Sequence, residues 1–115
     1  MVTVKDFYGK VLYTIDGKNV KDFYGRVQYE IDGKYIKDFY YKVLYQVDGN
    51  YIKDFYMRVQ YEFDGTVLKD FYKKFLLKID GDRIKDFYGG VVGSIEGRPD
   101  FMEKVMIALL FVDRA

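Results

Sequence analysis

The chain has 115 residues, of which 50% are hydrophobic, 32% are charged and 20% are aromatic. This composition predicts a single domain over residues 1–115 and excludes a disordered segment. Because 19 Lys and Arg residues face 18 Asp and Glu residues, the net charge of +1 excludes a partner recognised by charge alone, such as nucleic acid or an anionic membrane. The absence of His and Cys excludes metal sites built on these residues, His-based triads and disulfide bonds.

The string Lys-Asp-Phe-Tyr recurs every 16 residues and divides residues 4–99 into six units. We number each unit from the aliphatic residue before this string, so that positions two to five are Lys, Asp, Phe and Tyr. Position fourteen is always Gly. Units one and three read Lys-Val-Leu-Tyr where units two and four read Arg-Val-Gln-Tyr-Glu, which indicates that a two-unit block of 32 residues was duplicated. The six units are Val4–Asn19, Val20–Tyr35, Ile36–Tyr51, Ile52–Val67, Leu68–Arg83 and Ile84–Pro99.

Each unit is predicted to be a β-hairpin. Residues 26–31 alternate polar and apolar side chains and are rich in β-branched and aromatic residues, as strands are. Asp-Phe-Tyr-Gly favours a type I turn at one end of the hairpin, and Asp-Gly favours a tight two-residue turn at the other. The six units together form a meander of about twelve strands.

The register of the hairpin depends on the Asp-Phe-Tyr-Gly loop. If this loop holds two residues, position one faces position eight, and positions one, eight, ten and twelve share an apolar face. A bulge at the Gly would shift the pairing by one residue. We expect the first register, because it gathers the aliphatic residues. Tyr41, Met57 and Lys73 replace the Gly of this turn in the middle units, at a cost of roughly 1 kcal/mol each if the site is left-handed.

The C-terminal segment changes period and is predicted to be a helix within residues 100–115. Asp100 and Glu103 have the spacing of a capping box, and residues 105–112 are all apolar. The helix is too short to span a bilayer, and a helix that is apolar on every side needs burial on every side. We therefore predict an all-β, flower-like closed ring of six hairpins with the helix in its centre. The alternatives are an open β-solenoid capped by the helix, and a helix that anchors a membrane or a partner.

The last unit and the tail carry a resemblance to a known family. Residues 84–86 read Ile-Lys-Asp, residues 89–96 read Gly-Gly-Val-Val-Gly-Ser-Ile-Glu, and the apolar tail follows. This pattern resembles the bacterial β-flower proteins, which are four- or five-fold arrangements of hairpins. The chain departs from them in its six units, in Tyr at position ten of units one to four, and in Phe-Tyr where small polar residues are usual. The resemblance implies the fold and no functional residue, because the family has no assigned activity.

Candidate catalytic and metal-binding residues are few. Ser94 is the only serine, and no histidine is present to activate it. Residues 80–82 begin like a calcium-binding EF-hand loop, but Ile84 stands at the next ligand position. The turn carboxylates recur at equivalent sites, whereas acid–base catalysis uses an asymmetric pair. We predict that the protein is not an enzyme and holds no cofactor and no metal.

The Phe-Tyr pair is the one repeated feature that folding does not require, since turn centres are usually small or polar. Aromatic rings beside Lys and Asp suit the binding of sugars, peptides or single-stranded bases, although the interspersed Asp argues against nucleic acid. The alternative is a structural one, in which each Phe packs between neighbouring hairpins under its Tyr. The candidate interaction residues are Phe7, Tyr8, Phe23, Tyr24, Phe39, Tyr40, Phe55, Tyr56, Phe71, Tyr72, Phe87 and Tyr88.

Two classes of function follow from these residues. The first is a non-enzymatic structural or protein-interaction module, whose aromatic residues pack on one another, on a second copy or on another protein. The second is a multivalent, lectin-like module with up to six equivalent sites for carbohydrate. No signal peptide or membrane-spanning segment is visible around Met1–Lys5, so a cytoplasmic location is expected.

Overall fold

The computed structural model describes residues 1–112 and contains twelve β-strands followed by one helix. The predicted all-β repeat region with a C-terminal helix is confirmed, and residues 113–115 of the predicted tail lie outside the described residues. The helix α1 spans Phe101–Val112. The strands are β1 (Val2–Asp6), β2 (Val11–Asp16), β3 (Asn19–Asp22), β4 (Val27–Asp32), β5 (Tyr35–Asp38), β6 (Val43–Asp48), β7 (Tyr51–Lys53), β8 (Val59–Phe63), β9 (Val67–Asp70), β10 (Phe75–Asp80), β11 (Arg83–Asp86) and β12 (Val91–Glu96).

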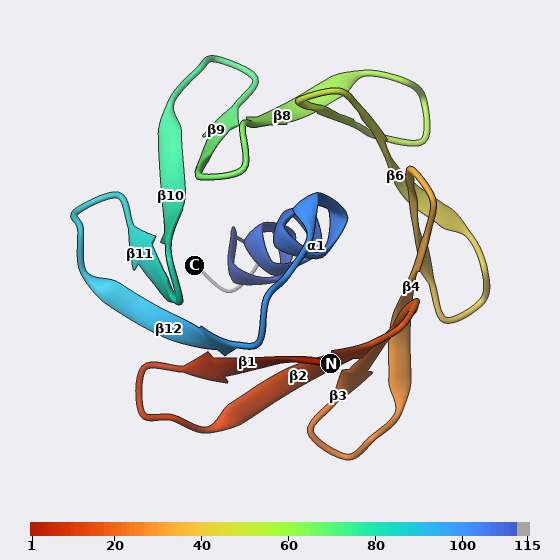
Figure 1. Ribbon diagram of the computed structural model, residues 1–115. Helices are drawn as coiled ribbons and strands as arrows, with labels where there is room; N and C mark the ends of the chain where they lie inside the picture. Colours follow the sequence, from red (N-terminus) through yellow and green to blue (C-terminus); the bar gives the residue numbers. More distant parts are fainter. Residues whose placement is uncertain (113–115) are drawn as a thin grey trace.

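The sheet is a closed ring. Each strand pairs antiparallel with its neighbours in sequence, and β1 pairs with β12, where Val4 lies opposite Ile95. The loops that join β1 to β2, β3 to β4 and the equivalent strands project outward around α1, and we call each such hairpin a petal (Figure 1). The molecule is a flattened disc of 36 × 33 × 22 Å. The closed ring is therefore confirmed, and the open solenoid is wrong.

The petal loop is longer than predicted. In unit two the backbone N–H of Asp22 donates to the carbonyl oxygen of Arg26 (2.9 Å), and the N–H of Gly25 donates to the carbonyl oxygen of Asp22 (3.0 Å). Gly25 is left-handed, with φ 80°. These bonds define a three-residue loop, in which a type I turn is followed by a left-handed residue. The expected two-residue loop is therefore wrong.

The hairpin register changes with the loop. Val20 lies opposite Tyr29 and Lys21 opposite Val27, so Gln28 forms a β-bulge between them. Position one thus faces position ten, not position eight. The left-handed residue of the loop accounts for one residue of this shift and the bulge accounts for the second.

The wall of the core consists of positions one and twelve, which are buried in every unit. The tyrosines at position ten are partly buried against this wall. Position eight, which we expected in the wall, lies opposite the Lys at position two on the other face of the sheet and is only half-buried. The wall residues are Val4, Val20, Ile36, Ile52, Leu68 and Ile84 at position one, and Ile15, Ile31, Val47, Phe63, Ile79 and Ile95 at position twelve.

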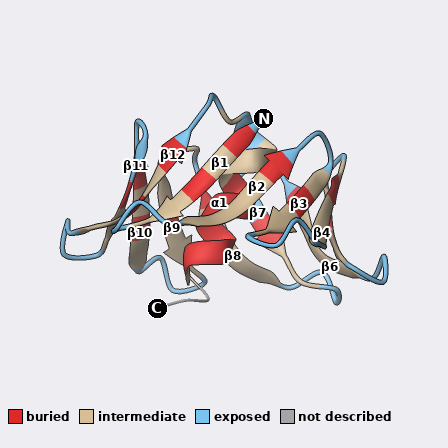
Figure 2. Ribbon diagram, turned by 90° about the horizontal axis from the view of Figure 1, so that it is seen from below, coloured by how far each residue is buried: buried red, intermediate tan, exposed pale blue. Residues whose placement is uncertain are grey.

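Helix α1 occupies the centre of the ring, as predicted (Figures 1 and 2). Its N-terminus is a capping box: the N–H of Asp100 donates to Glu103 Oε1 (3.0 Å), and the N–H of Glu103 donates to Asp100 Oδ1 (2.8 Å). Residues 105–111 are all buried, so the ring covers the helix on every side. Within residues 1–112, no helix has the length and apolar character needed to cross a membrane.

The helix also explains why the last two units depart from the repeat. Leu77 and Gly93 stand at position ten, where units one to four have Tyr. A Cβ atom on Gly93 would lie 2.6 Å from Cζ of Phe111 and 2.5 Å from the carbonyl oxygen of Lys5. Phe111 thus takes the space that a side chain at this position would need. The loss of Tyr in these units follows from seating an asymmetric helix inside a repetitive ring.

The Asp-Gly turns connect neighbouring petals. Gly17 has φ 64° and is the first of two loop residues, which matches a type II′ turn. In five of the six turns the acidic residue before this Gly forms an ion pair with the Lys at position two of the next unit, with N–O distances of 2.8–3.8 Å in four of them. The fifth pair crosses the junction between β12 and β1. These pairs are Lys21–Asp16, Lys37–Asp32, Lys53–Asp48, Lys85–Asp80 and Lys5–Glu96. In the sixth turn Asp64 instead accepts hydrogen bonds from the backbone N–H groups of Thr66 and Val67.

Candidate binding rim and grooves

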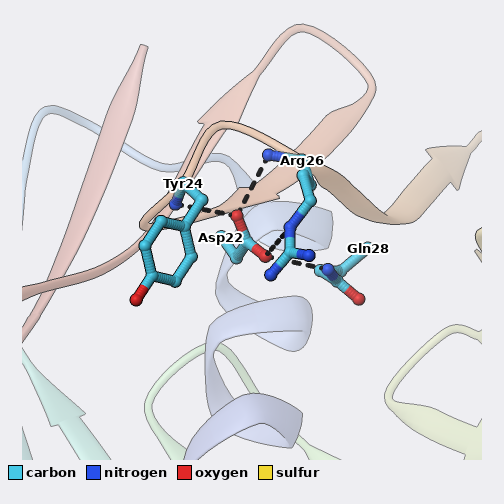
Figure 3. A network of polar contacts seen from close by, with 4 residues as sticks. All are labelled: Asp22, Tyr24, Arg26 and Gln28. Carbon is cyan, nitrogen blue, oxygen red and sulfur yellow. Dashed lines mark hydrogen bonds and ion pairs between the residues drawn. The ribbon is translucent and has the colours of Figure 1, made fainter.

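The petal loops share one conformation in all six units. In each, Oδ1 of the Asp at position three accepts hydrogen bonds from the backbone N–H groups of positions five and seven, at 2.8–3.0 Å. In unit two the donors to Asp22 are Tyr24 and Arg26 (Figure 3). The carboxylate therefore fills the inside of the loop. The two central side chains, Phe and Tyr, are left on the outside.

Three petal loops keep this conformation without glycine. Tyr41, Met57 and Lys73 have φ values of 66–67° at the site that is Gly in the other units. L-residues disfavour this region because Cβ approaches the following carbonyl oxygen. The strained site is thus confirmed to be left-handed. Tyr41 and Met57 are exposed, and Tyr41 adds a third aromatic ring to its petal tip.

The Phe-Tyr pairs are exposed at the tips of the petals. The six Phe side chains are 53–63% exposed and the six Tyr side chains are 73–89% exposed. In each loop the two rings meet edge to face, with centroids 5.2–5.4 Å apart. The structural alternative, in which each Phe is buried under its Tyr, is therefore wrong. We call these twelve residues the aromatic rim: Phe7, Tyr8, Phe23, Tyr24, Phe39, Tyr40, Phe55, Tyr56, Phe71, Tyr72, Phe87 and Tyr88.

A polar network lies beside the rim in unit two. Oδ2 of Asp22 accepts from Arg26 Nε (3.2 Å) and from Gln28 Nε2 (2.9 Å), in addition to the two backbone bonds on Oδ1 (Figure 3). The guanidinium of Arg26 lies over the ring of Tyr24, 5.3 Å from its centroid. Four donors thus converge on one carboxylate, and they place a cation and an amide at the foot of the petal.

Unit four repeats this network. Asp54 accepts from Arg58 Nε and from Gln60 Nε2, both at 3.0 Å, and Arg58 lies 5.3 Å from the ring centroid of Tyr56. The hydrogen bond from the backbone N–H of Arg58, with those from the other donors, holds the pKa of Asp54 below its ordinary value. These Arg and Gln residues are not among the candidates predicted from the sequence. Their signal was the Arg-Val-Gln string of the 32-residue duplication.

A groove separates neighbouring petals beside each network. Its floor is the start of one petal's second strand, and its far wall is the aromatic pair of the next petal. The grooves have volumes of about 480 Å³ between units two and three and about 350 Å³ between units four and five. Both grooves are shallow and open to solvent. The first is lined by Arg26, Val27, Gln28, Phe39 and Tyr40, and the second by Arg58, Val59, Gln60, Phe71 and Tyr72.

The remaining grooves are chemically different. Between units one and two, Lys10 and Leu12 take the places of Arg and Gln, and the volume is about 200 Å³. Between units five and six, Phe75 replaces Val and contacts Phe87, with ring centroids 6.0 Å apart. At the junction of units six and one, Gly90 stands where the other units have a cation. We expected six equivalent sites. The six loops share one backbone conformation, but the side chains that line the grooves between them differ.

The acidic residues do not gather around a common centre. Among the residues described, no group of three or more Asp or Glu side chains is placed to hold a metal ion. Five of the six turn acids pair with a Lys of the next unit, and the petal acids accept hydrogen bonds from backbone N–H groups of their own loop. No family model, curated protein or solved structure matches this chain, so the function rests on the geometry of the rim and the grooves.

Proposed function

We propose that the protein is a non-enzymatic, multivalent interaction module that binds through its aromatic rim. The observation that carries this proposal is the exposure of twelve aromatic side chains at six petal tips. The core is complete without them, since positions one and twelve and helix α1 are buried independently of the rim. Exposed apolar surface of this extent marks an interaction site rather than a folding requirement. The ring of hairpins around one helix also supports kinship with the β-flower proteins.

The ionisable groups support a binding role rather than catalysis. A general acid or base works best with a pKa near the operating pH. The hydrogen bonds to Asp54 instead lower its pKa, and the bond from Lys37 lowers the pKa of Asp32. Carboxylates held in this way stay ionised near neutral pH and serve as hydrogen-bond acceptors. Asp54 shapes a loop that carries the rim, and Asp32 holds the turn between two petals.

The first candidate partner is another protein chain, with a second copy of this chain as the case to test. Sedimentation velocity from dilute to concentrated solution should show an average mass that rises with concentration. A variant with Phe23→Ser, Phe39→Ser and Phe55→Ser should stay monomeric and keep its thermal stability, because these rings lie outside the core. A wild-type chain that remains monomeric at every concentration would exclude self-association through the rim.

The second candidate ligand is carbohydrate, and the grooves between the petals favour it. Each of the two larger grooves places an aromatic pair opposite hydrogen-bonding side chains, whereas the rim alone offers mainly rings. Binding to immobilised glycans, with no concentration-dependent rise in mass, would select this form of the proposal over self-association.

A further inference from the structure

The two grooves that combine an aromatic pair with an Arg-Gln network stand out from the rest of the surface. We propose that the groove between units two and three and the groove between units four and five each bind a neutral oligosaccharide. This inference rests on the proposed binding function of the rim and names its ligand and its sites. It also assigns a role to the 32-residue duplication, which placed the same residues in both grooves.

The aromatic wall of each groove suits the apolar face of a sugar ring. Phe39 and Tyr40 line the groove between units two and three and are both more than half exposed. Val27 forms part of the lining beside them and adds aliphatic surface. A pyranose presents C–H groups on one face and hydroxyl groups around its edge, so stacking its C–H face on Phe39 leaves its hydroxyl edge toward Arg26 and Gln28.

The polar wall offers both donors and acceptors without net charge. Asp22 compensates the charge of Arg26 through Nε, and the terminal nitrogens of the guanidinium remain as donors to a ligand. Gln28 donates to Asp22 through Nε2, and its amide oxygen points away from that carboxylate as an acceptor (Figure 3). A sugar hydroxyl group both donates and accepts hydrogen bonds, so it can bind the guanidinium donors of Arg26 and the amide oxygen of Gln28 together. A free anion would use only the donors and would meet a cation that is already neutralised.

The number of sites follows from the differences between the grooves. Leu12 and Leu44 replace Gln in units one and three, so these grooves lack the amide. Between units five and six, Phe75 replaces Val and contacts Phe87, and Leu76 replaces Gln. Gly90 removes the cation at the junction of units six and one. Two sites per chain are therefore expected, although the rim has six petals.

The experiment is an NMR titration of the full ¹⁵N-labelled chain with neutral hexaoses. The probes are cellohexaose, xylohexaose, mannohexaose and fully N-acetylated chitohexaose, with hexagalacturonate as the charged comparison. At least one neutral hexaose should shift amide resonances of residues 26–28 and 39–40 together with those of residues 58–60 and 71–72, saturating at two ligands per chain. Added salt should leave this affinity unchanged, because the groove carries no net charge.

The repeat supplies matched variants that are expected to fold. Gln28→Leu introduces the residue that units one and three already have at this position, and should weaken binding at the first groove about tenfold while the second groove is unaffected. Gln60→Leu should do the reverse. The combined change Lys42→Arg and Leu44→Gln copies the network into unit three and should raise the number of sites from two to three. Unshifted resonances outside the substituted unit will establish that each variant is folded.

Three outcomes would overturn the assignment of the grooves. The first is the absence of binding by every neutral hexaose, and the second is binding by hexagalacturonate alone. The third is binding that maps to the rim away from the grooves and ignores Gln28→Leu and Gln60→Leu. With this third result the groove sites would be wrong, but the rim would still be the binding surface and the proposed function would stand. Self-association without any sugar binding would separate them in the same way.

Discussion

At the scale of single residues, the petal loop depends on one left-handed position. Gly occupies it in units one, two and six, with φ 80–82°, whereas Tyr41, Met57 and Lys73 occupy it in the middle units with φ 66–67°. A residue with a Cβ atom pays about 1–2 kcal/mol in this conformation. Because Tyr41 and Met57 are exposed, packing recovers little of that cost. The petals of units three, four and five therefore hold backbone strain that the petals of units one, two and six do not.

Replacing Tyr41, Met57 or Lys73 by Gly should raise the free energy of unfolding by about 1 kcal/mol each, because Gly adopts positive φ without strain. Urea denaturation monitored by circular dichroism measures the change. The reverse substitution Gly25→Ala is the control and should lower the free energy of unfolding by a similar amount. A destabilised Tyr41→Gly variant would show that the tyrosine side chain contributes packing that outweighs its strain.

The turn carboxylates make the folded state less stable as the pH falls. The hydrogen bond from Lys37 holds the pKa of Asp32 below its ordinary value of 3.8, and the bonds from Lys53 and Lys85 do the same for the pKa of Asp48 and of Asp80. Because the folded chain binds these protons less readily than the unfolded chain, the stabilisation is present above pH 3.8 and is lost as the pH falls below it.

Thermal melting between neutral pH and about pH 3 should therefore show a Tm that falls on the acid side. Asp32→Asn should lower the Tm at neutral pH. It should also reduce the fall of Tm with decreasing pH, because it removes one of the carboxylates whose pKa is lowered by folding. Melting temperatures that stay constant down to the acid limit would mean that these ion pairs contribute nothing to folding.

At the scale of secondary structure, helix α1 breaks the symmetry of the ring. The ring has near six-fold symmetry and a single helix has none, so α1 cannot contact every unit in the same way. Position ten shows this difference: Phe111 packs where Gly93 has no side chain, and Leu77 is buried where other units have a partly buried Tyr. Packing of Phe111 therefore accounts for Gly93 in unit six, and the strand that carries Leu77 also contacts α1.

Gly93→Ala tests this account. The added Cβ atom would lie 2.5 Å from the carbonyl oxygen of Lys5 and 2.6 Å from Phe111, so overpacking should cost about 1–3 kcal/mol. The control is Gly90→Ala, whose Cβ would approach the carboxylate of Asp86 no closer than 3.4 Å. Equal stability of the two variants by chemical denaturation would show that the core yields freely around Phe111.

At the scale of the whole molecule, ring and helix complete one another. Closure by β1 and β12 satisfies the backbone groups that an open stack would leave unpaired. It also leaves a central space lined by the aliphatic side chains of positions one and twelve, and the residues of α1 from 105 to 111 fill it. Neither part buries its apolar surface without the other, so folding is expected to be a single cooperative transition.

Leu109→Asp should destabilise the protein by about 3 kcal/mol or more, because it places an unpaired charge at a buried site. Leu109→Met, which conserves volume, should cost far less. Deletion of residues 100–115 should abolish the cooperative transition seen by calorimetry and lead to aggregation. A truncated chain that stays monomeric and melts cooperatively would show that the ring is stable without α1.

Local patterns in the sequence determined the elements and their arrangement. Alternation of apolar and polar residues, turn signals at every half-repeat and an all-apolar tail specify hairpins and a buried helix, because these signals act over a few residues. The ring followed from them, since the helix needed cover on every side.

The register of the hairpins did not follow from the sequence, because Asp-Phe-Tyr-Gly is compatible with a two-residue loop and with the three-residue loop that the structure has. Likewise, only the tertiary structure decided that the Phe-Tyr pairs are exposed and that Arg26 and Gln28 face Phe39 across a groove. Those contacts join residues of different hairpins. Their geometry depends on the spacing and the twist between neighbouring hairpins in the closed ring, and the sequence of a single repeat does not specify either.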